Sequence, residues 1–404
     1  MKEISGGVCA PLGFTASGIH SGIRKNKERL DLALIYCERE CNAAAVFTTN
    51  RVKAAPVYLD MKNIKSGKMQ AVIANSGNAN ACAPNGMQNA EKMCAVTAKE
   101  LGLNPERVFV CSTGVIGVEL DTTPVENALP ALAKSLSKEG AEAAAQAILT
   151  TDLVKKEIAL EAEIGGKTVK IGAIAKGSGM IHPNMGTMLC FITTDAAIDA
   201  TLLDKALKET VKRTFNRVSV DGDTSTNDTA VVLASGMAGN AEITSEDEDY
   251  NTFCALLYKV CEHLARAIAR DGEGATRLIT CEVKGAKDEK SAEKLAKSVI
   301  GSSLTKAAMF GSDANWGRVI CAMGYSGEEF DPEKVKISFK SVKGEILVCE
   351  AGRGLVFDED KAKEILSQDE VIISASLAEG NGQATVWGCD LTYDYVKING
   401  DYRS

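Results

Sequence analysis

The sequence predicts a mixed α/β fold in two parts. Short runs of apolar and β-branched residues alternate with longer runs that carry apolar residues at helical spacing, which is typical of sheets covered by helices. The chain has 404 residues, which is long for a single hydrophobic core. From about Lys284 the pattern becomes that of a smaller, compact α/β module, and we place a boundary near Lys287.

The first part of the chain supplies several strands and helices. Strand-like runs lie at Leu32–Cys37, Ala43–Thr48, Gln70–Asn75 and Val108–Ser112. A helix is expected over Met87–Leu101 and should end at Gly102, because glycine readily takes the left-handed conformation that closes helices. Pro124 suits the first turn of a helix that reaches about Leu136, and a further helix is expected over Glu139–Leu149.

The middle of the chain contains a predicted hairpin, then a turn-rich segment that gives way abruptly to an apolar one. Glu157–Ile164 and Thr168–Ala175 are strand-like and are joined by a Gly-Gly pair, a two-residue turn signal. The stretch that follows, KGSGMIHPNMGTMLCFITTDA, is rich in turn residues as far as Gly186. From Thr187 it becomes a continuous apolar run, which predicts a strand buried on both faces.

The remaining elements follow from capping signals and apolar spacing. Asp199 is placed to cap a helix that reaches Phe215, and Thr229–Ala234 reads as a strand. Ser245 and Glu248 resemble a capping box at the start of a long amphipathic helix. In the C-terminal module the expected strands are Val335–Lys340, Glu345–Glu350, Val371–Leu377 and Ala384–Asp390, with a helix near Lys361.

Composition and charge exclude several classes of partner. The net charge is -8, with 45% hydrophobic and 25% charged residues, so there is no basic surplus for binding nucleic acid or an anionic membrane. No apolar stretch has the length of a membrane span, and the first residues carry no signal-like apolar segment, so a cytoplasmic protein is expected. The 13 cysteines lack the paired spacing of a zinc site, so reduced, mostly buried thiols and no metal are expected.

Common catalytic and nucleotide-binding motifs are absent from the sequence. His263 falls on the predicted long helix, His20 sits in a loop with nothing nearby to orient it, and His182 is a candidate that no Gly-x-Ser-x-Gly elbow accompanies. The segment GGKT lacks the glycine that a phosphate-binding loop needs at Glu161. A dinucleotide-binding fingerprint also fails, because His182 stands where the third glycine belongs.

One nucleophile scheme needs no histidine. If the peptide bond between Gly186 and Thr187 is broken, Thr187 gains an α-amine with a pKa of about 7.7 to 8.0, close enough to neutrality to act as base for its own hydroxyl. One residue then supplies nucleophile and base, and the buried strand behind it provides a rigid scaffold. On spacing alone, an ordinary threonine at a loop-to-strand junction stays an open alternative.

The segment KGSGMIHPNMGTML closely resembles the self-processing motif of the ornithine acetyltransferase family, also called the glutamate N-acetyltransferase or ArgJ family. Seven further segments match this family in order: NSGNANAC at Asn75, CSTGVIG at Cys111, LTTD at Leu149, DGDTSTND at Asp221, RDGEGATR at Arg270, SDANWGR at Ser312 and the terminal INGDYRS. The resemblance covers essentially the whole chain. It implies a DmpA/ArgJ-like layered sheet-and-helix fold with a smaller C-terminal α/β module.

The resemblance also implies that a precursor is cut before Thr187. An α chain of residues 1–186 would carry the oxyanion hole and substrate contacts, and a β chain of residues 187–404 would begin with the nucleophile. Residues 187–286 would complete the main core, and residues 287–404 would form the C-terminal module. Members of the family move acetyl from N2-acetyl-L-ornithine to L-glutamate through an acetyl-threonine intermediate, and an α2β2 heterotetramer is implied.

Site residues carry over from the resemblance by motif match. Thr113 and Gly114 would form the oxyanion hole, because a hydroxyl and a backbone N–H are suitable donors to a developing oxyanion. Substrate contacts would be made by Thr150, Lys176, Thr187, Glu273, Asn399 and Ser404. The match leaves a choice of one residue between Thr150 and Thr151.

Two of these residues have an obvious chemical part, and one position departs from the family pattern. Lys176 suits a substrate carboxylate and Glu273 a substrate ammonium, although a lysine or glutamate taken alone is more often a solvated surface charge. The family usually has alanine before the nucleophile, whereas this chain has Gly186. Glycine widens the allowed backbone conformations, so we expect a looser cut site and slower or less complete cleavage.

Several functional alternatives stay open at the level of the sequence. No cofactor is expected, and acetyl-CoA as a further acetyl donor is undecided, because no coenzyme A site can be recognised. An N-terminal-nucleophile aminopeptidase or amidohydrolase of similar fold would use water where this family uses glutamate. A noncatalytic small-molecule binding protein would keep an intact chain.

Overall fold

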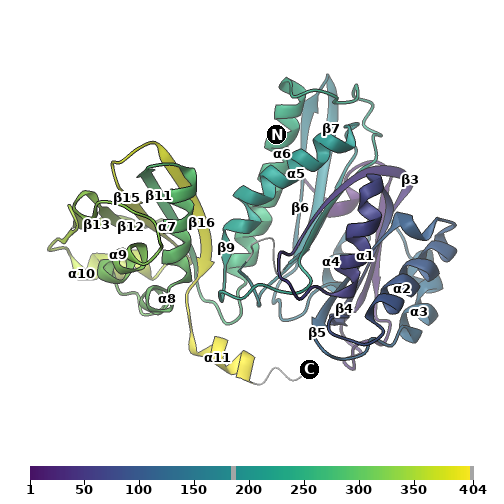
Figure 1. Cartoon of the computed structure of the whole chain (residues 1–404), viewed down its shortest axis with the longest axis horizontal. Coiled ribbons are helices and arrows are strands. Elements are labelled where there is room, and N and C mark those ends of the chain that lie inside the picture. The colour runs from purple at the N-terminus through teal and green to yellow at the C-terminus, as the bar shows by residue number, and fades with distance from the viewer. Residues whose placement is uncertain (183–187, 401–404) are drawn as a thin grey trace.

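The computed structural model describes residues 1–182 and 188–400, which form two sheets flanked by helices (Figure 1). The nine-stranded sheet of this described part contains β1 (Lys2–Ile4), β2 (Phe14–Ile19), β3 (Leu32–Phe47), β4 (Lys68–Asn78), β5 (Val108–Val115), β6 (Lys156–Ile164), β7 (Lys167–Lys176), β8 (Leu189–Thr194) and β10 (Thr229–Ala234). Its strand order is β1-β6-β7-β8-β10-β3-β4-β5, with β2 paired to β3. The predicted mixed α/β fold is confirmed.

The second sheet belongs mainly to the C-terminal part of the chain. It contains β9 (Val218–Ser219), β11 (Leu278–Ala286), β12 (Lys336–Ser341), β13 (Gly344–Glu350), β14 (Arg353–Gly354), β15 (Glu370–Ser376) and β16 (Gly382–Cys389). The short β9 pairs with β16 at one edge of the sheet, so a segment from before the long helix α6 (Glu248–Arg270) also enters this sheet. A division of the chain at Lys287 stays a prediction.

Helices cover the two sheets in separate groups. α1 (Ala55–Asn63), α2 (Gly86–Leu101) and α3 (Thr123–Lys134) accompany the β3-β4-β5 end of the large sheet, whereas α5 (Ala200–Arg213) and α6 pack on its β6 to β10 region (Figure 1). The other α-helices of the described residues are α4 (Ala141–Ala147), α7 (Glu289–Gly301), α8 (Ser303–Phe310), α9 (Trp316–Gly324), α10 (Glu359–Leu366) and α11 (Tyr393–Gly400). No described helix combines the length and the apolar character that crossing a bilayer requires.

The strand predicted after the turn-rich loop is β8, which lies inside the large sheet. All six of its residues are buried. Cys190 and Ile192 pack into the core formed with α5 and α6, and Leu189 and Phe191 pack into the core on the opposite face. The prediction of a strand buried on both faces is confirmed. β8 has a hydrophobic core on each side of the sheet, so neither of its faces meets solvent.

Two local predictions were wrong. The runs at Leu32–Cys37 and Ala43–Thr48 belong to one long strand, β3. The exposed charged residues Glu38–Glu40 between the two runs suggest a loop, but they lie within the strand, where the pairing of β3 with β4 is irregular. The N-cap of α6 is Asp247, whose Oδ1 accepts a hydrogen bond from the backbone N of Tyr250 at 3.1 Å. Ser245 instead donates its hydroxyl to the Asp247 carboxylate at 2.7 Å.

Candidate active site

Six of the predicted site residues line one cavity of about 400 Å³, and they come from five separate parts of the chain. They are Thr113 and Gly114 at the end of β5, Thr150 after α4, Lys176 at the end of β7, Glu273 after α6 and Asn399 on α11. Thr151 lines the same cavity, so the structure leaves the choice between Thr150 and Thr151 open. The predicted cut site at Gly186 and Thr187 and the predicted contact Ser404 lie outside the described residues.

The start of β8 pairs with one of the residues that line the cavity, Lys176. Leu189, the first residue of β8, pairs with Lys176 of the antiparallel strand β7 and with Thr229 of the parallel strand β10. Met188, which precedes Leu189, is buried, and its carbonyl accepts a hydrogen bond from Thr229 N at 2.9 Å. Sheet pairing therefore fixes the chain immediately after the predicted nucleophile on both sides.

Close backbone approach explains the glycine at the predicted oxyanion hole. β5 runs parallel to β4, and the pairing becomes irregular where Gly114 meets Gly77. Gly114 has a φ of 137°, and a Cβ atom at this position would lie 2.5 Å from the backbone N of Asn78. Any side chain at position 114 would push these two strand ends apart.

Asn227 holds the end of β5 in place, and sequence reasoning did not single it out. Its Nδ2 donates to the carbonyl of Ser112 at 2.7 Å and to that of Ala79 at 2.6 Å, and Asn227 lines the cavity. Ser112 also donates its hydroxyl to Asn75 Oδ1 at 2.6 Å. Because Ser112 directly precedes Thr113, these bonds fix the strand end that carries the predicted oxyanion donors. The available signal was the matching segment DGDTSTND, which contains Asn227.

Lys176 and Glu273 are buried, unlike most lysine and glutamate side chains, which are solvated at the surface. Their relative exposures are 2% and 8%. Burial lowers the pKa of Lys176, and the neighbouring carboxylate of Asp152 opposes this effect. Asp152 Oδ2 lies 3.8 Å from Lys176 Nζ.

Glu273 is held between a glycine of one loop and the C-terminal helix. A Cβ atom at Gly179 would lie 2.7 Å from Glu273 Oε1, so only glycine leaves room for the carboxylate in its observed position. Asn399 Nδ2 donates to Glu273 Oε2 at 2.8 Å. The next residue, Gly274, has a φ of 69°, and a Cβ atom there would lie 2.6 Å from the backbone N of Tyr395 on α11. α11 therefore sits directly against the turn that presents Glu273.

The described part of the loop before the predicted cut is anchored by the segment that follows β9. Asp221 Oδ1 accepts from Ile181 N at 2.8 Å, and Thr224 donates its hydroxyl to the carbonyl of His182 at 2.9 Å. Burial raises the pKa of Asp221 to about 6. His182 Nδ1 lies 2.9 Å from Ser219 Oγ, and burial lowers the pKa of this histidine.

The described histidines do not line the cavity. His263 is exposed on α6, and His182 contacts Ser219 as described. His20 does have groups that orient it, contrary to expectation, since its Nδ1 lies 3.3 Å from Asp31 Oδ2 and 3.0 Å from the carbonyl of Arg29. Within the described part of the chain, no cluster of three or more His, Cys, Asp or Glu side chains is arranged to hold a metal ion.

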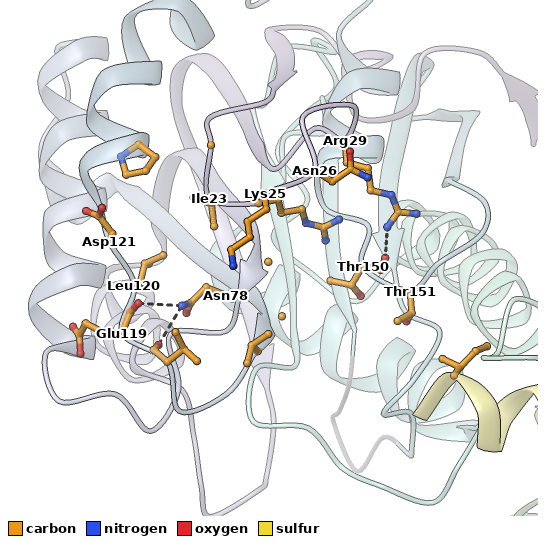
Figure 2. Close-up of a pocket in the computed structure, with 18 residues that line it drawn as sticks. Ile23, Lys25, Asn26, Arg29, Asn78, Glu119, Leu120, Asp121, Thr150 and Thr151 are labelled. Carbon is orange, nitrogen blue, oxygen red and sulfur yellow. Dashed lines mark hydrogen bonds between the residues drawn. The ribbon is translucent and has the colours of Figure 1, made fainter. Parts of the chain in front are cut away.

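A larger cavity of about 860 Å³ adjoins the first (Figure 2). The two share the lining residues Gly114, Val115, Thr150 and Thr151. Lys25 and Arg29 also line the larger cavity, and Arg29 Nη1 donates to the carbonyl of Thr150 at 2.7 Å (Figure 2). The wall that carries the predicted oxyanion hole therefore faces both spaces.

Comparison with known proteins identifies the family. The chain matches the ArgJ family over residues 15–404. It belongs to the ArgJ family. It is 52% identical over 405 residues to the arginine biosynthesis bifunctional protein ArgJ of Caldanaerobacter subterraneus subsp. tengcongensis, with 100% of both chains covered. It is 54% identical to ArgJ 1 of Clostridium acetobutylicum, with 97% of this chain and 96% of the relative covered.

A solved ArgJ structure resembles part of the chain. The crystal structure of arginine biosynthesis bifunctional protein ArgJ from Bacillus halodurans is 49% identical, with a TM-score of 0.50. The match covers 52% of this chain and 98% of the solved chain, so the solved ArgJ chain corresponds to about half of the present one.

Proposed function

We propose that this ArgJ-family protein is an acetyltransferase of arginine biosynthesis. It transfers acetyl from N2-acetyl-L-ornithine to L-glutamate, giving ornithine and N-acetylglutamate. The nucleophile is Thr187, freed by self-cleavage between Gly186 and Thr187. The observation that carries the proposal is the single cavity that gathers Thr113 and Gly114 with the buried cation Lys176 and the buried anion Glu273.

Self-cleavage begins with attack of the Thr187 hydroxyl on the carbonyl carbon of Gly186. The C–N bond breaks and an ester bond to Oγ forms, while the proton of the hydroxyl passes to the departing nitrogen. Water then hydrolyses the ester, which releases a carboxylate on Gly186 and restores the hydroxyl. Thr187 now has a free α-amine that can accept the proton of its own hydroxyl. The solved ArgJ chain of about half this length supports a cut near the middle of the precursor.

Acetyl transfer follows as a ping-pong reaction. The hydroxyl oxygen of Thr187 attacks the acetyl carbonyl, and its proton moves to the α-amine. Thr113 and the N–H of Gly114 stabilise the negative charge on the carbonyl oxygen. The C–N bond to ornithine then breaks, and the proton passes from the α-amine to the leaving nitrogen. The neutral α-amine of glutamate attacks the resulting acetyl ester and regenerates the hydroxyl.

The charged residues of the cavity orient the substrate. Lys176 pairs with the carboxylate of N2-acetyl-L-ornithine, and Glu273 pairs with its side-chain ammonium. Both protein charges are buried, so each gains more from an opposite charge than it would at the surface. The hydrogen bond from Asn399 leaves the other oxygen of the Glu273 carboxylate for the ammonium.

Intact mass spectrometry tests this function. Purified protein should give a β chain that begins at Thr187 and that gains one acetyl group when N2-acetyl-L-ornithine is added without glutamate. Adding glutamate should discharge the acetyl group and yield N-acetylglutamate. Release of ornithine at the same rate with and without glutamate would instead indicate an aminopeptidase-type hydrolase. An intact chain that binds these amino acids without transferring acetyl would indicate a noncatalytic binding protein.

The larger cavity supports acetyl-CoA as a further acetyl donor. Its volume of about 860 Å³ exceeds what an amino acid needs, and Lys25 and Arg29 offer positive charge to phosphate groups. The relatives carry the name bifunctional. Formation of N-acetylglutamate from acetyl-CoA and glutamate in the absence of N2-acetyl-L-ornithine tests this activity.

The same proposal includes an assembly and a cellular location. We place the enzyme in the cytoplasm as an α2β2 heterotetramer, each half of which contains one α chain of residues 1–186 and one β chain of residues 187–404. Multi-angle light scattering of the cleaved protein tests the assembly, since the heterotetramer has twice the mass of one precursor chain.

A further inference from the structure

Four buried charged side chains form a continuous array next to the substrate cavity. Lys156 Nζ lies 2.8 Å from Asp152 Oδ1 and 2.6 Å from Asp271 Oδ2. Asp152 Oδ2 lies 3.8 Å from Lys176 Nζ. Exposures run from 1% for Asp152 to 8% for Asp271, with Lys156 and Lys176 each at 2%. Cations and anions alternate along the array, so its charges balance.

Asp152 fixes the end of the array that carries Lys176. Its Oδ1 accepts a hydrogen bond from Gly177 N at 2.6 Å, and its Oδ2 accepts one from Thr150 N at 3.0 Å. Burial raises the pKa of Asp152, but the attraction of Lys176 and Lys156 outweighs burial and holds the pKa well below its usual range. One ionised carboxylate therefore holds both the lysine and the threonine that line the cavity.

Asp271 fixes the end of the array that leads to Glu273. It is the C-cap of α6, and its carboxylate accepts from Leu153 N at 3.1 Å. The carbonyl of Asp271 accepts from Ser178 Oγ at 2.6 Å, and the carbonyl of Ser178 accepts from Glu273 N at 3.0 Å. The backbone of Glu273 is thus tied to Asp271 through a single buried serine.

Lys156 joins the two ends and has no donor left for a ligand. Its ammonium has three N–H groups, which meet Asp152 Oδ1, Asp271 Oδ2 and, at 3.2 Å, the carbonyl of Val154. Removing one partner from such a buried ionic network leaves an uncompensated charge, so its members hold each other in a single arrangement. Lys156 therefore holds neighbouring protein groups in place and does not bind a ligand.

Two charges in the cavity depend on this array. Lys176 is the cation held by Asp152, and Glu273 is the anion tied to Asp271. A diamino acid presents a carboxylate at one end and an ammonium at the other, so a fixed separation between Lys176 and Glu273 favours one chain length. A side chain with one methylene more or less would leave one buried charge imperfectly paired.

We propose that the array of Asp152, Lys156 and Asp271 sets the separation between Lys176 and Glu273 and thereby selects the chain length of the diamino acid that the cavity accepts. Lys156 is then a positioning residue that acts through the two aspartates. The proposal rests on the proposed function, because it takes Lys176 and Glu273 as the groups that bind the two ends of the substrate.

The test compares Lys156→Met with wild type on two donors. The cleaved enzymes are assayed for acetyl transfer to glutamate from N2-acetyl-L-ornithine and from N2-acetyl-L-lysine, which is one methylene longer. The wild type should prefer the ornithine compound by about 10- to 200-fold in kcat/KM, the range expected for one methylene. Lys156→Met should lose most of this preference, mainly through a higher KM for the ornithine compound. The ratio does not depend on how much enzyme is folded, so a loss of stability alone leaves it unchanged.

Arg217→Met is the matched control. Arg217 is a buried cation, 6% exposed, that pairs with Glu289 at 2.7 Å and Glu293 at 3.3 Å and does not line the cavity. Its loss should lower stability and leave the preference between the two donors unchanged. Asp271→Asn is the second test variant for the case in which Lys156→Met does not fold, since it breaks the same array with a side chain of nearly the same shape.

The outcomes separate this inference from the function on which it rests. A reduced preference in Lys156→Met or Asp271→Asn, together with an unchanged one in Arg217→Met, supports the positioning array. An unchanged preference in active Lys156→Met or Asp271→Asn overturns the array as a determinant of chain length. Absence of acetyl transfer by the wild-type enzyme overturns the proposed function itself, and the inference with it.

Discussion

The carboxylate of Glu273 occupies the space that a side chain on Gly179 would need. A Cβ atom at Gly179 would lie 2.7 Å from Glu273 Oε1. The atoms that would have to move belong to the carboxyl group at the end of the flexible Glu273 side chain, so the fold can tolerate a methyl group at position 179. The position of the buried anion cannot remain the same.

Gly179→Ala should therefore impair substrate binding more than stability. We expect the KM for N2-acetyl-L-ornithine to rise about 10-fold or more, because displacing one partner of a charged hydrogen bond costs about 1.5 to 3 kcal/mol. Steady-state kinetics and a thermal melt check this. Gly301→Ala is the control, since a Cβ atom at Gly301 meets nothing within 4 Å. A wild-type KM in Gly179→Ala would exclude Glu273 as the anchor of the ammonium.

The oxyanion role of Thr113 can be separated from its packing. Thr113→Val replaces the hydroxyl by a methyl group of similar size, so kcat should fall by about 10²- to 10³-fold, the usual cost of one oxyanion donor. Thr113→Ser keeps the hydroxyl and should retain most of the activity. Equal loss in both variants would show that the shape of Thr113 matters and its hydroxyl does not.

The cut site should respond to both of its residues. Thr187→Ala should remain a single inactive chain, because no hydroxyl can attack the preceding carbonyl. Gly186→Ala should be cut faster or more completely than the wild type, since alanine restricts the backbone that glycine leaves free. Denaturing gels taken over time, with N-terminal sequencing of the smaller products, measure both. Two fragments from Thr187→Ala would contradict self-cleavage by this residue.

Asp221 should make the protein less stable as the pH rises. Its pKa is raised to about 6 by burial in the folded state. In the unfolded chain the pKa of an aspartate is about 3.9. Between about pH 4 and pH 6 the Asp221 carboxyl group is therefore protonated in the folded state and ionised in the unfolded state. Stability should therefore fall between about pH 4 and pH 6 and stay lower above pH 6, by up to about 3 kcal/mol.

Asp221→Asn should remove this loss while keeping an oxygen acceptor for Ile181 N. Thermal melts should show that the stability advantage of the variant over wild type grows from about pH 4 to about pH 6 and then stays constant. Asp223→Asn, at an exposed position two residues away, is the control. A stability difference between Asp221→Asn and wild type that does not change with pH would contradict the burial of an ionising carboxyl.

Much of the local structure could be predicted because its causes lie within a few residues. Gly102 closes α2 with a φ of 68°, and the Asp199 side chain accepts from Thr201 N and Leu202 N at the start of α5. The failures lie where distant contacts override a local signal. β3 continues through its charged triplet because its neighbours in the sheet pair with it on both sides of the triplet.

The candidate site divides in the same way. Motif resemblance identified Thr113, Lys176 and Glu273, and the structure brings these three to one cavity. The resemblance did not indicate any role for Lys156, whose partner Asp271 is 115 residues away in the chain. A charge run or motif shows which residue types are present, but an ion pair of this kind exists only once β6 and the end of α6 are packed together.

The sequence by itself determined the family, the buried strand after the turn-rich loop and the residue types that the proposed chemistry needs, because these depend on local order along the chain. Only the tertiary structure decided that Lys176 and Glu273 are buried and that the array of Asp152, Lys156 and Asp271 connects them. Burial and separation in space are properties of the packed core, and in the core a charge is stable only beside its partners.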